Sequence, residues 1–275
     1  YLHYMEPHAP YSAPSPFNRR FDPDHPLPYH RRHPHYEGFL PFQRGTPLPP
    51  RARDNLIAQY DGEIAYVDEV LSELFRTLRQ LGRYDQTLII VTADHGEEFY
   101  DHGGWGHGKS LFNELLHVPL IVRDPRLAPR GTVLTQTVRH VDLMPTILDV
   151  CGIPLPEGLE GHSVLPTVRG DPEVLTAPVY SEVFHEASSA RALQSGRFKL
   201  IEARASTQEA WLLFDLEHDP NEQQPLDLTT HPRGPELKQL LASFEERANR
   251  MSVAAKPMEL DQGVQRELRA LGYLQ

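Results

Sequence analysis

The stretch Thr87-Leu-Ile-Ile-Val-Thr-Ala-Asp-His-Gly-Glu97 decides how this sequence is interpreted. Its first seven residues, 87–93, form an almost unbroken apolar and β-branched run, which is typical of a strand buried on both faces of a parallel sheet. Before it, apolar residues recur every three or four positions from Ile57 to Leu81, which predicts a helix that ends at Gly82. A helix followed by a buried strand predicts an α/β fold.

The rest of the chain divides into two regions. Residues 118–122 are expected to add a second core strand, and 142–150 a helix with Asp142 as its N-cap. From about residue 176 the pattern predicts a small antiparallel sheet, with a tight reversal at 195–196. Its strands are expected at 179–184, 191–193, 198–201 and 211–216, followed by a helical stripe at 237–248 and a short helix near 271–272. We therefore expect an α/β core over 1–175 and a C-terminal subdomain over 176–275.

Composition disfavours some classes of partner. With 27 Lys and Arg against 38 Asp and Glu, the net charge of −11 disfavours binding to nucleic acid or an anionic membrane surface. No apolar run approaches the roughly 18 residues that span a bilayer.

The lone Cys151 cannot form an internal disulfide, and we expect it to be a small buried hydrophobe. Twelve of the 26 prolines lie in residues 1–50, which predicts a long loop. The chain opens at Tyr1 without a leader, so the natural N-terminus is expected upstream.

Acids, histidines and a lysine follow the predicted strand directly, over residues 94–110. Ligands of open α/β sheets bind beyond the carboxyl ends of strands, so this is where a site is expected. Asp94 offers a hard oxygen and His95 a borderline nitrogen, a pair suited to Ca²⁺, Mg²⁺, Mn²⁺ or Zn²⁺. Two ligands do not close a metal shell, and the alternative is that Asp94 caps a turn against which His95 packs.

The segment Gly103-Gly-Trp-Gly-His-Gly-Lys-Ser110 also fits the pattern of a nucleotide-binding loop letter by letter. Its context disagrees, because such a loop leads from a buried strand straight into a helix, whereas Glu97, Glu98 and Asp101 intervene here. Their charges would also repel phosphates. What this segment does predict is a close approach of backbone to a ligand, with Lys109 facing an anion.

Several motifs taken in order resemble a known family. They are Tyr1-Leu-His-Tyr-Met-Glu-Pro-His-Ala-Pro-Tyr11, Tyr60-Asp-Gly-Glu-Ile-Ala-Tyr-Val-Asp68, Thr92-Ala-Asp-His-Gly-Glu97, Gly106-His-Gly-Lys109, His117-Val-Pro-Leu-Ile121, Val141-Asp-Leu-Met-Pro-Thr-Ile-Leu148, Gly196-Arg-Phe-Lys-Leu-Ile201, Leu213-Phe-Asp-Leu-Glu-His-Asp-Pro-Asn-Glu222 and Leu271-Gly-Tyr273. This series resembles the sulfatase family of the alkaline phosphatase superfamily over essentially the whole chain.

The resemblance implies an alkaline-phosphatase-like sheet core, present in part, and specific roles for five residues. Asp94 and His95 match metal ligands, with Ca²⁺ the usual ion and Mn²⁺, Zn²⁺ or Mg²⁺ as alternatives. Lys109 matches the lysine that contacts the sulfate group, and His8 matches a histidine beside the substrate. His107 is a weaker match, for which a packing role is equally open.

One departure from the family limits these expectations. The motif Cys/Ser-x-Pro-x-Arg, whose first residue becomes the formylglycine nucleophile, does not occur in these 275 residues, nor do the upstream acidic metal ligands. We expect the C-terminal part of a sulfuric ester hydrolase, inactive without the missing N-terminal segment. A phosphodiesterase or phosphonate monoester hydrolase, and a noncatalytic binding protein on the same fold, are the alternatives. Substrate recognition is expected in loops such as 12–50, and a periplasmic or secreted location is suggested by the resemblance alone.

Overall fold

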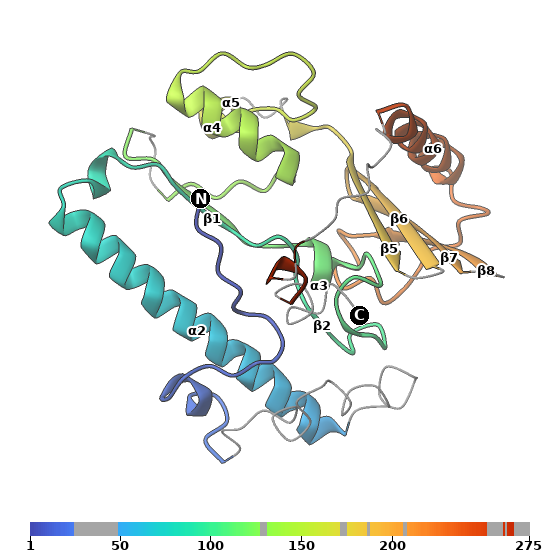
Figure 1. The fold of residues 1–275 in the computed structure, drawn as a ribbon. Helices are drawn as coiled ribbons and strands as arrows, with labels where there is room; N and C mark the ends of the chain where they lie inside the picture. The colour runs from blue at the N-terminus through green and yellow to red at the C-terminus, as the bar shows by residue number, and fades with distance from the viewer. Residues whose placement is uncertain are drawn as a thin grey trace.

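The computed structural model describes residues 1–24, 49–126, 131–170, 175–185, 188–205, 208–251, 261 and 263–266. The elements are, in chain order, η1 (Phe17–Arg19), α2 (Pro50–Gln80), η3 (Tyr84–Gln86), β1 (Ile89–Thr92), β2 (Glu98–Phe99), β3 (Trp105–Gly106), α3 (Asn113–Leu116), β4 (Leu120–Arg123), η4 (His140–Asp142), α4 (Leu143–Cys151), α5 (Leu165–Val168), β5 (Val179–His185), β6 (Ser188–Ser195), β7 (Phe198–Ala205), β8 (Gln208–Asp215) and α6 (Gly234–Met251). The structure is mixed α/β, with the segment from β2 to α3 lying between the long helix α2 and the sheet β5–β8 (Figure 1).

Helix α2 confirms the predicted helix and extends it at its N-terminus to Pro50, where proline is compatible with the first turn. It ends where predicted, because Gly82 adopts a φ of +64°, a conformation that glycine takes without strain. A buried cluster joins this helix to the N-terminal segment and to the β2–β3 hairpin; its members are Tyr11, Leu56, Phe99 and Trp105. The N-terminal segment is thereby held along α2 and next to the residues that follow β1.

Strand β1 corrects the central prediction in part. The apolar run does form a strand, but β1 pairs antiparallel with β4, in a register that sets Ile89 opposite Arg123. The prediction of a parallel strand buried on both faces is wrong for the described residues: Thr92 is exposed and Ile89–Val91 are only half buried. An apolar run indicates burial but carries no information about the direction of the neighbouring strand. Here β4 returns beside β1 after the turn made by α3.

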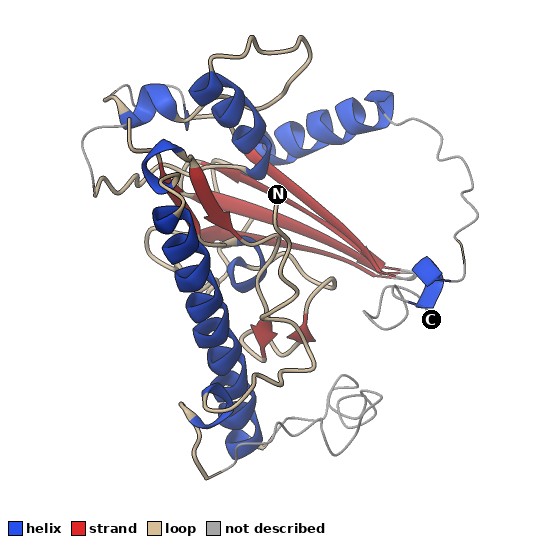
Figure 2. Ribbon diagram, turned by 60° about the vertical axis from the view of Figure 1, so that its left-hand side comes forward, coloured by secondary structure: helices blue, strands red, loops and turns tan. Residues whose placement is uncertain are grey.

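The four-stranded sheet β5–β8 confirms the predicted antiparallel sheet in sequence order. Strand β6 is longer than expected, and Gly196 makes the predicted reversal into β7 with a φ of +58°. Helix α6 covers one face, where Leu237 and Leu241 complete a buried apolar cluster. Leu111 and Phe112, which follow the glycine-rich segment, pack on the opposite face. The sheet is therefore covered on both faces, as Figure 2 shows for α6.

Two smaller expectations around α4 are wrong. Asp142 precedes the predicted helix but makes no side-chain cap bond to it. Its carboxylate instead accepts the backbone N–H groups of Arg139 and His162 at 2.8 and 2.9 Å, because an acid can cap the turn before the helix as readily as the helix itself. Cys151 is exposed rather than buried, since it lies in the last turn of α4 on the solvent side. The helix expected near 271–272 lies outside the described residues.

Candidate functional site

The chain leaves β1 through Asp94 and His95 and is then fixed by Gly96. The Gly96 N–H donates to the Leu115 carbonyl at 2.9 Å. A Cβ atom on residue 96 would lie 2.0 Å from the carbonyl oxygen of Glu114, so only glycine allows this approach. The end of β1 is thus held against α3, and the two preceding side chains have a defined anchor.

Asp94 and His95 lie close together at the end of β1. Asp94 Oδ2 lies 3.8 Å from His95 Nε2. His95 Nδ1 donates to the Gly96 carbonyl at 2.8 Å, so the lone pair of the neutral ring is on Nε2. A histidine that binds metal commonly donates its other N–H to a carbonyl in this way. Asp94 Oδ1 also accepts the His95 backbone N–H at 3.0 Å, so the predicted capping contact is present together with the possible ligand pair.

His107 lies beside this pair. Its ring centroid is 4.2 Å from that of His95 and 5.1 Å from that of His8. His107 Nδ1 donates to Glu97 Oε1 at 2.9 Å. This hydrogen bond to a buried carboxylate raises the pKa of His107, although partial burial acts in the opposite direction. Gly106 and Gly108, with φ values of +79° and +78°, make the turns on either side that bring the imidazole inward.

His8 reaches the same place from the N-terminal segment. Its Nδ1 donates to the Ala9 carbonyl at 2.6 Å, and its buried Nε2 has no hydrogen-bond partner among the residues that the structure describes. Glu63 on α2 fixes the backbone by accepting the N–H groups of His8 and Ser12, at 3.2 and 2.6 Å. Burial raises the pKa of Glu63 to about 7.

Lys109 follows His107 by two residues, but the hollow that it lines includes none of His8, Asp94, His95 and His107. Lys109 is exposed and borders this hollow of about 230 Å³ between the glycine-rich segment and the ends of the β5–β6 and β7–β8 hairpins. Its positive charge lowers the pKa of His107, and the charge of Asp94 raises it. The structure therefore groups four of the five residues singled out by sequence in one place, namely His8, Asp94, His95 and His107, and places Lys109 on a hollow that none of these four lines. Their roles stay predictions.

Sequence reasoning missed two residues of this group, Glu97 and Tyr11. Tyr11 is fully buried, and its hydroxyl donates to Glu97 Oε2 at 2.8 Å. Glu97 therefore bridges Tyr11 and His107. Burial, followed by the charge of Glu97, raises the pKa of Tyr11 well above its usual value. The available signal is the position of Glu97 at the end of the motif Thr92-Ala-Asp-His-Gly-Glu97, shortly after the predicted strand.

The glycine-rich segment 103–110 does not have the geometry of a nucleotide-binding loop. It contains β3, which pairs with β2 as a short hairpin, and α3 is a single turn that begins at Asn113. Such a loop requires a strand before it and a helix after it. The structure therefore agrees with the rejection of the nucleotide interpretation.

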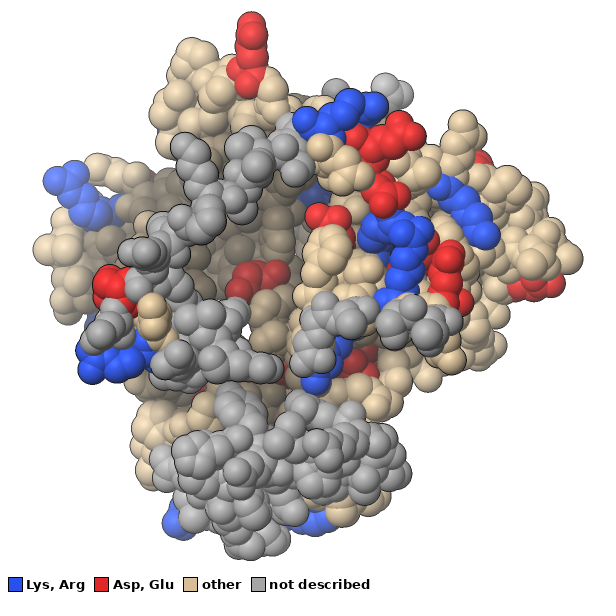
Figure 3. Space-filling view, turned by 45° about the vertical axis from the view of Figure 1, so that its right-hand side comes forward, with Lys and Arg blue, Asp and Glu red and all other residues tan. Residues whose placement is uncertain are grey.

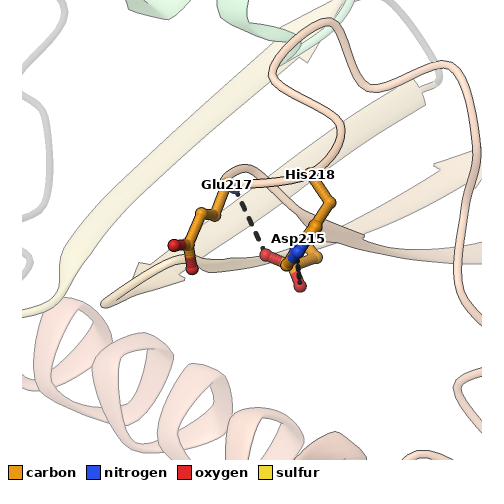
Figure 4. Close-up of side chains that lie close together, drawn as sticks. All are labelled: Asp215, Glu217 and His218. Atoms are coloured by element: carbon orange, nitrogen blue, oxygen red, sulfur yellow. Dashed lines mark hydrogen bonds and ion pairs between the residues drawn. The ribbon is translucent and has the colours of Figure 1, made fainter.

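A second group of acids lies at the end of β8, where Asp215, Glu217 and His218 approach one another closely enough to hold a cation (Figure 4). Arg197 already pairs with two of them, with nitrogen–oxygen distances of 3.2 Å to Asp215 and 2.6 Å to Glu217. His218 Nδ1 contacts Asp215 Oδ2 at 3.0 Å. Because both carboxylates already pair with Arg197, this group gives no independent indication of a metal.

The face drawn in Figure 3 carries charged side chains of both signs. Basic and acidic side chains are intermixed on the right-hand side of Figure 3. Among the residues that the structure describes, no helix has the length and apolar character needed to cross a membrane.

Comparisons with known proteins identify the family. The chain matches the Sulfatase family model over residues 1–153 and the N-sulphoglucosamine sulphohydrolase C-terminal model over residues 101–251. It is 35% identical to a choline-sulfatase of Rhizobium meliloti over 216 residues, which cover 77% of this chain and 40% of that protein. It is 33% identical to human arylsulfatase K over 61% of this chain and 33% of that protein. The chain thus spans less than half the length of these relatives.

Solved structures that resemble this chain identify its fold. The phosphonate monoester hydrolase of Silicibacter pomeroyi superposes with a TM-score of 0.68 at 28% identity, over 91% of this chain and 56% of that one. A sulfatase structure in complex with D-glucosamine-2-N,6-O-disulfate superposes with a TM-score of 0.65 at 24% identity, which bears on the fold alone. The fold is alkaline-phosphatase-like, and the chain belongs to the sulfatase family of the alkaline phosphatase superfamily.

Proposed function

We propose that this chain is the C-terminal part of a metal-dependent sulfuric ester hydrolase. The observation that carries the proposal is the grouping of His8, His95 and His107. Each ring directs Nδ1 to a protein acceptor, namely the carbonyls of Ala9 and Gly96 and the carboxylate of Glu97, so each neutral ring has its lone pair on Nε2. Three oriented imidazoles beside a carboxylate are suited to an ester anion and a cation together.

The donor set fits a divalent metal ion. Ligand atoms of one ion lie about 2.0 to 2.6 Å from it, and two such ligands are compatible with the 3.8 Å between Asp94 Oδ2 and His95 Nε2. Asp94 and His95 would hold the ion, with Ca²⁺ the first choice and Mn²⁺, Zn²⁺ or Mg²⁺ as alternatives. When bound, such an ion stabilises negative charge on the oxygens of the ester.

The other side chains act on the ester group itself. Lys109 contacts the nonbridging oxygens as a fixed positive charge. His8 lies beside the departing oxygen and donates a hydrogen bond or proton to it when protonated. His107, whose pKa is raised by Glu97, adds a second donor to the same anion or supports His95 by ring contact.

The nucleophile and the remaining metal ligands are proposed to come from sequence outside these 275 residues, since the Cys/Ser-x-Pro-x-Arg motif is absent here. Residues 1–275 alone are then expected to be inactive. The phosphonate monoester hydrolase alternative is supported by the Silicibacter pomeroyi structure, which covers 91% of this chain. Tetrahedral sulfate and phosphonate esters both need a cation clamp.

Turnover of matched substrates tests the proposal. The natural full-length protein should hydrolyse 4-nitrophenyl sulfate faster than 4-nitrophenyl phenylphosphonate, and treatment with a chelator should abolish activity until metal is added back. A preference for the phosphonate would support the alternative. No turnover of either ester, with no metal retained after dialysis, would favour the noncatalytic binding protein.

A further inference from the structure

A buried ion pair joins the two tail motifs that the proposed chemistry leaves without a role. Lys199 on β7 is 1% exposed, and Glu222, in the loop after β8, is 2% exposed. Lys199 Nζ lies 2.7 Å from Glu222 Oε1. Glu222 has a φ of +54°, which is uncommon for a residue with a side chain and persists only where surrounding contacts hold it.

The partners of this pair lie at the two ends of the loop that carries His107 and Lys109. At the C-terminal end, the Asn113 N–H donates to Glu222 Oε2 at 2.6 Å, and Lys199 Nζ donates to Asn113 Oδ1 at 2.9 Å. At the N-terminal end, His102 Nε2 lies 3.0 Å from the Glu222 carbonyl oxygen. One acidic residue therefore holds both ends of the loop 103–112.

His102 closes the loop on itself. Its Nδ1 lies 2.6 Å from Glu114 Oε1, and its ring stacks on Phe112 with centroids 3.6 Å apart. Burial opposes a charged ring, but the acceptors on Glu114 and Glu222 outweigh it and raise the pKa of His102. Phe112 in turn packs with the cluster on the face of the sheet opposite α6.

A buried ion pair contributes little net stability to a fold, because both charges lose their hydration. Removing two charges from water costs several kcal/mol for each ion, and well-packed apolar residues often stabilise as much or more. Elsewhere in the same sheet, buried positions such as Leu200 and Leu213 are apolar, so this sheet also uses apolar packing for its stability. What a hydrogen-bonded ion pair provides beyond packing is a fixed direction for each of its contacts.

We propose that Lys199 and Glu222 are positioning residues, through which the C-terminal sheet fixes the loop 103–112 so that His107 and Lys109 face the ester site. The geometric part stands on the contacts above, and only its catalytic consequence rests on the proposed function. The two tail motifs are then required for activity although neither touches the substrate.

The test uses Lys199→Met and Glu222→Gln in the natural full-length protein, with Lys238→Met as the matched control. Lys238 is an exposed lysine on α6, where its ammonium lies 4.4 Å from the centre of the Trp211 ring. We expect Lys199→Met to lower kcat/KM by about tenfold to a hundredfold, mostly through kcat, because small displacements of a catalytic group have effects of that size. Lys238→Met should change it by less than about twofold, as surface substitutions do.

Hydrogen exchange followed by mass spectrometry supplies a readout independent of activity. Peptides covering 102–113 should exchange faster in Lys199→Met, while peptides of α2 are unchanged. Glu222→Gln keeps an acceptor oxygen for the Asn113 N–H and should show a smaller change in the same peptides. If Lys199→Met does not fold, the kinetics and the hydrogen exchange of Glu222→Gln decide the test. Unchanged exchange in this loop, or a loss of kcat no larger than the loss of folded protein by circular dichroism, would overturn the proposal. If the unmodified protein hydrolyses no sulfate ester, the proposed function fails and the exchange result still decides the positioning claim.

Discussion

The end of β1 and the sheet β5–β8 are built from different kinds of contact. The sheet has buried apolar residues on both faces, and α6 completes one of these clusters. Around the end of β1, by contrast, buried carboxylates fix the backbone and the rings: Glu63 holds His8, and Glu97 holds both Tyr11 and His107. The apolar clusters of the sheet contribute stability, whereas the buried carboxylates, like the Lys199–Glu222 pair of the sheet itself, fix the orientation of other groups.

Apolar side chains are more deeply buried in the sheet β5–β8 than in the sheet that contains β1. Leu213 in β8 is fully buried, whereas Ile121 in β4 is 62% exposed. Under the proposed function, in which this chain is part of a longer protein, the β1–β4 sheet is continued by other strands. Substitutions in the two regions should therefore affect different properties.

The largest effect is expected for Asp94→Ala in the full-length protein. Loss of a ligand and of its charge should lower kcat/KM by about a thousandfold or more, since metal-bound charge stabilisation amounts to several kcal/mol. The melting temperature of the C-terminal sheet should stay unchanged in this variant. Turnover and metal content after dialysis measure the effect, and Asp85→Ala, an acid whose side chain is 88% exposed, is the control.

Lys109→Ala should have the next largest effect on activity. One charge-assisted contact to a transition-state anion contributes about 1.5 to 4 kcal/mol, so kcat/KM should fall by about tenfold to a thousandfold. Lys109→Arg should recover little, because a planar guanidinium does not occupy the place of an ammonium. Lys238→Ala, on α6, should leave kinetics unchanged; an equal loss in both variants would remove Lys109 from the site.

Stability should respond in the opposite region. Leu213→Ala removes a fully buried side chain and should lower the free energy of unfolding by about 2 to 5 kcal/mol. Ile121→Ala, at a position that is 62% exposed, should cost less than about 1 kcal/mol in the isolated 275-residue chain. Urea unfolding followed by circular dichroism measures both. Equal losses would contradict the division into an apolar and a polar region.

A smaller, pH-dependent effect is expected from Glu63. Its pKa rises from 4.5 in the unfolded chain to about 7 in the folded protein, because it is buried. The folded state thus holds this proton more tightly, so the contribution of Glu63 to stability is fully present below pH 4.5 and is lost as pH rises to about 7. Glu63→Gln should remove this pH-dependent loss of unfolding free energy, which amounts to at most about 3 kcal/mol, since one pKa unit is about 1.4 kcal/mol.

The measurement is the difference in unfolding free energy between wild type and Glu63→Gln at pH 5 and pH 8. The control is Glu69→Gln, an exposed acid on the same helix. A difference that does not depend on pH would show that Glu63 titrates normally in the folded state.

The sequence predicted well those features that depend on local pattern. Spacing of three and four residues predicted α2 and α6, and the Ser195-Gly196 pair predicted the β6–β7 hairpin. The direction of β4 against β1 could not be predicted, because an apolar run has no direction. The exposure of Cys151 depends on which side of α4 is covered, which is set by distant residues.

The candidate site shows the same limit. Asp94 and His95 were found because they follow a strand directly. Glu97 and Tyr11 were missed because their contact joins residues 86 positions apart in the chain. The Lys199–Glu222 pair was likewise hidden, since burial of a lysine and a glutamate is improbable until each is seen to be the partner of the other.

The most direct test of the account is a crystal structure of the full-length protein grown with metal, with anomalous scattering used to locate the ion. Mn²⁺ can serve as the anomalous probe. The account predicts one ion within about 2.0 to 2.6 Å of both Asp94 and His95, with Lys109 and the Nε2 atoms of His8 and His107 facing the same cavity. An ion bound instead by Asp215, Glu217 and His218, with none at Asp94, would contradict it.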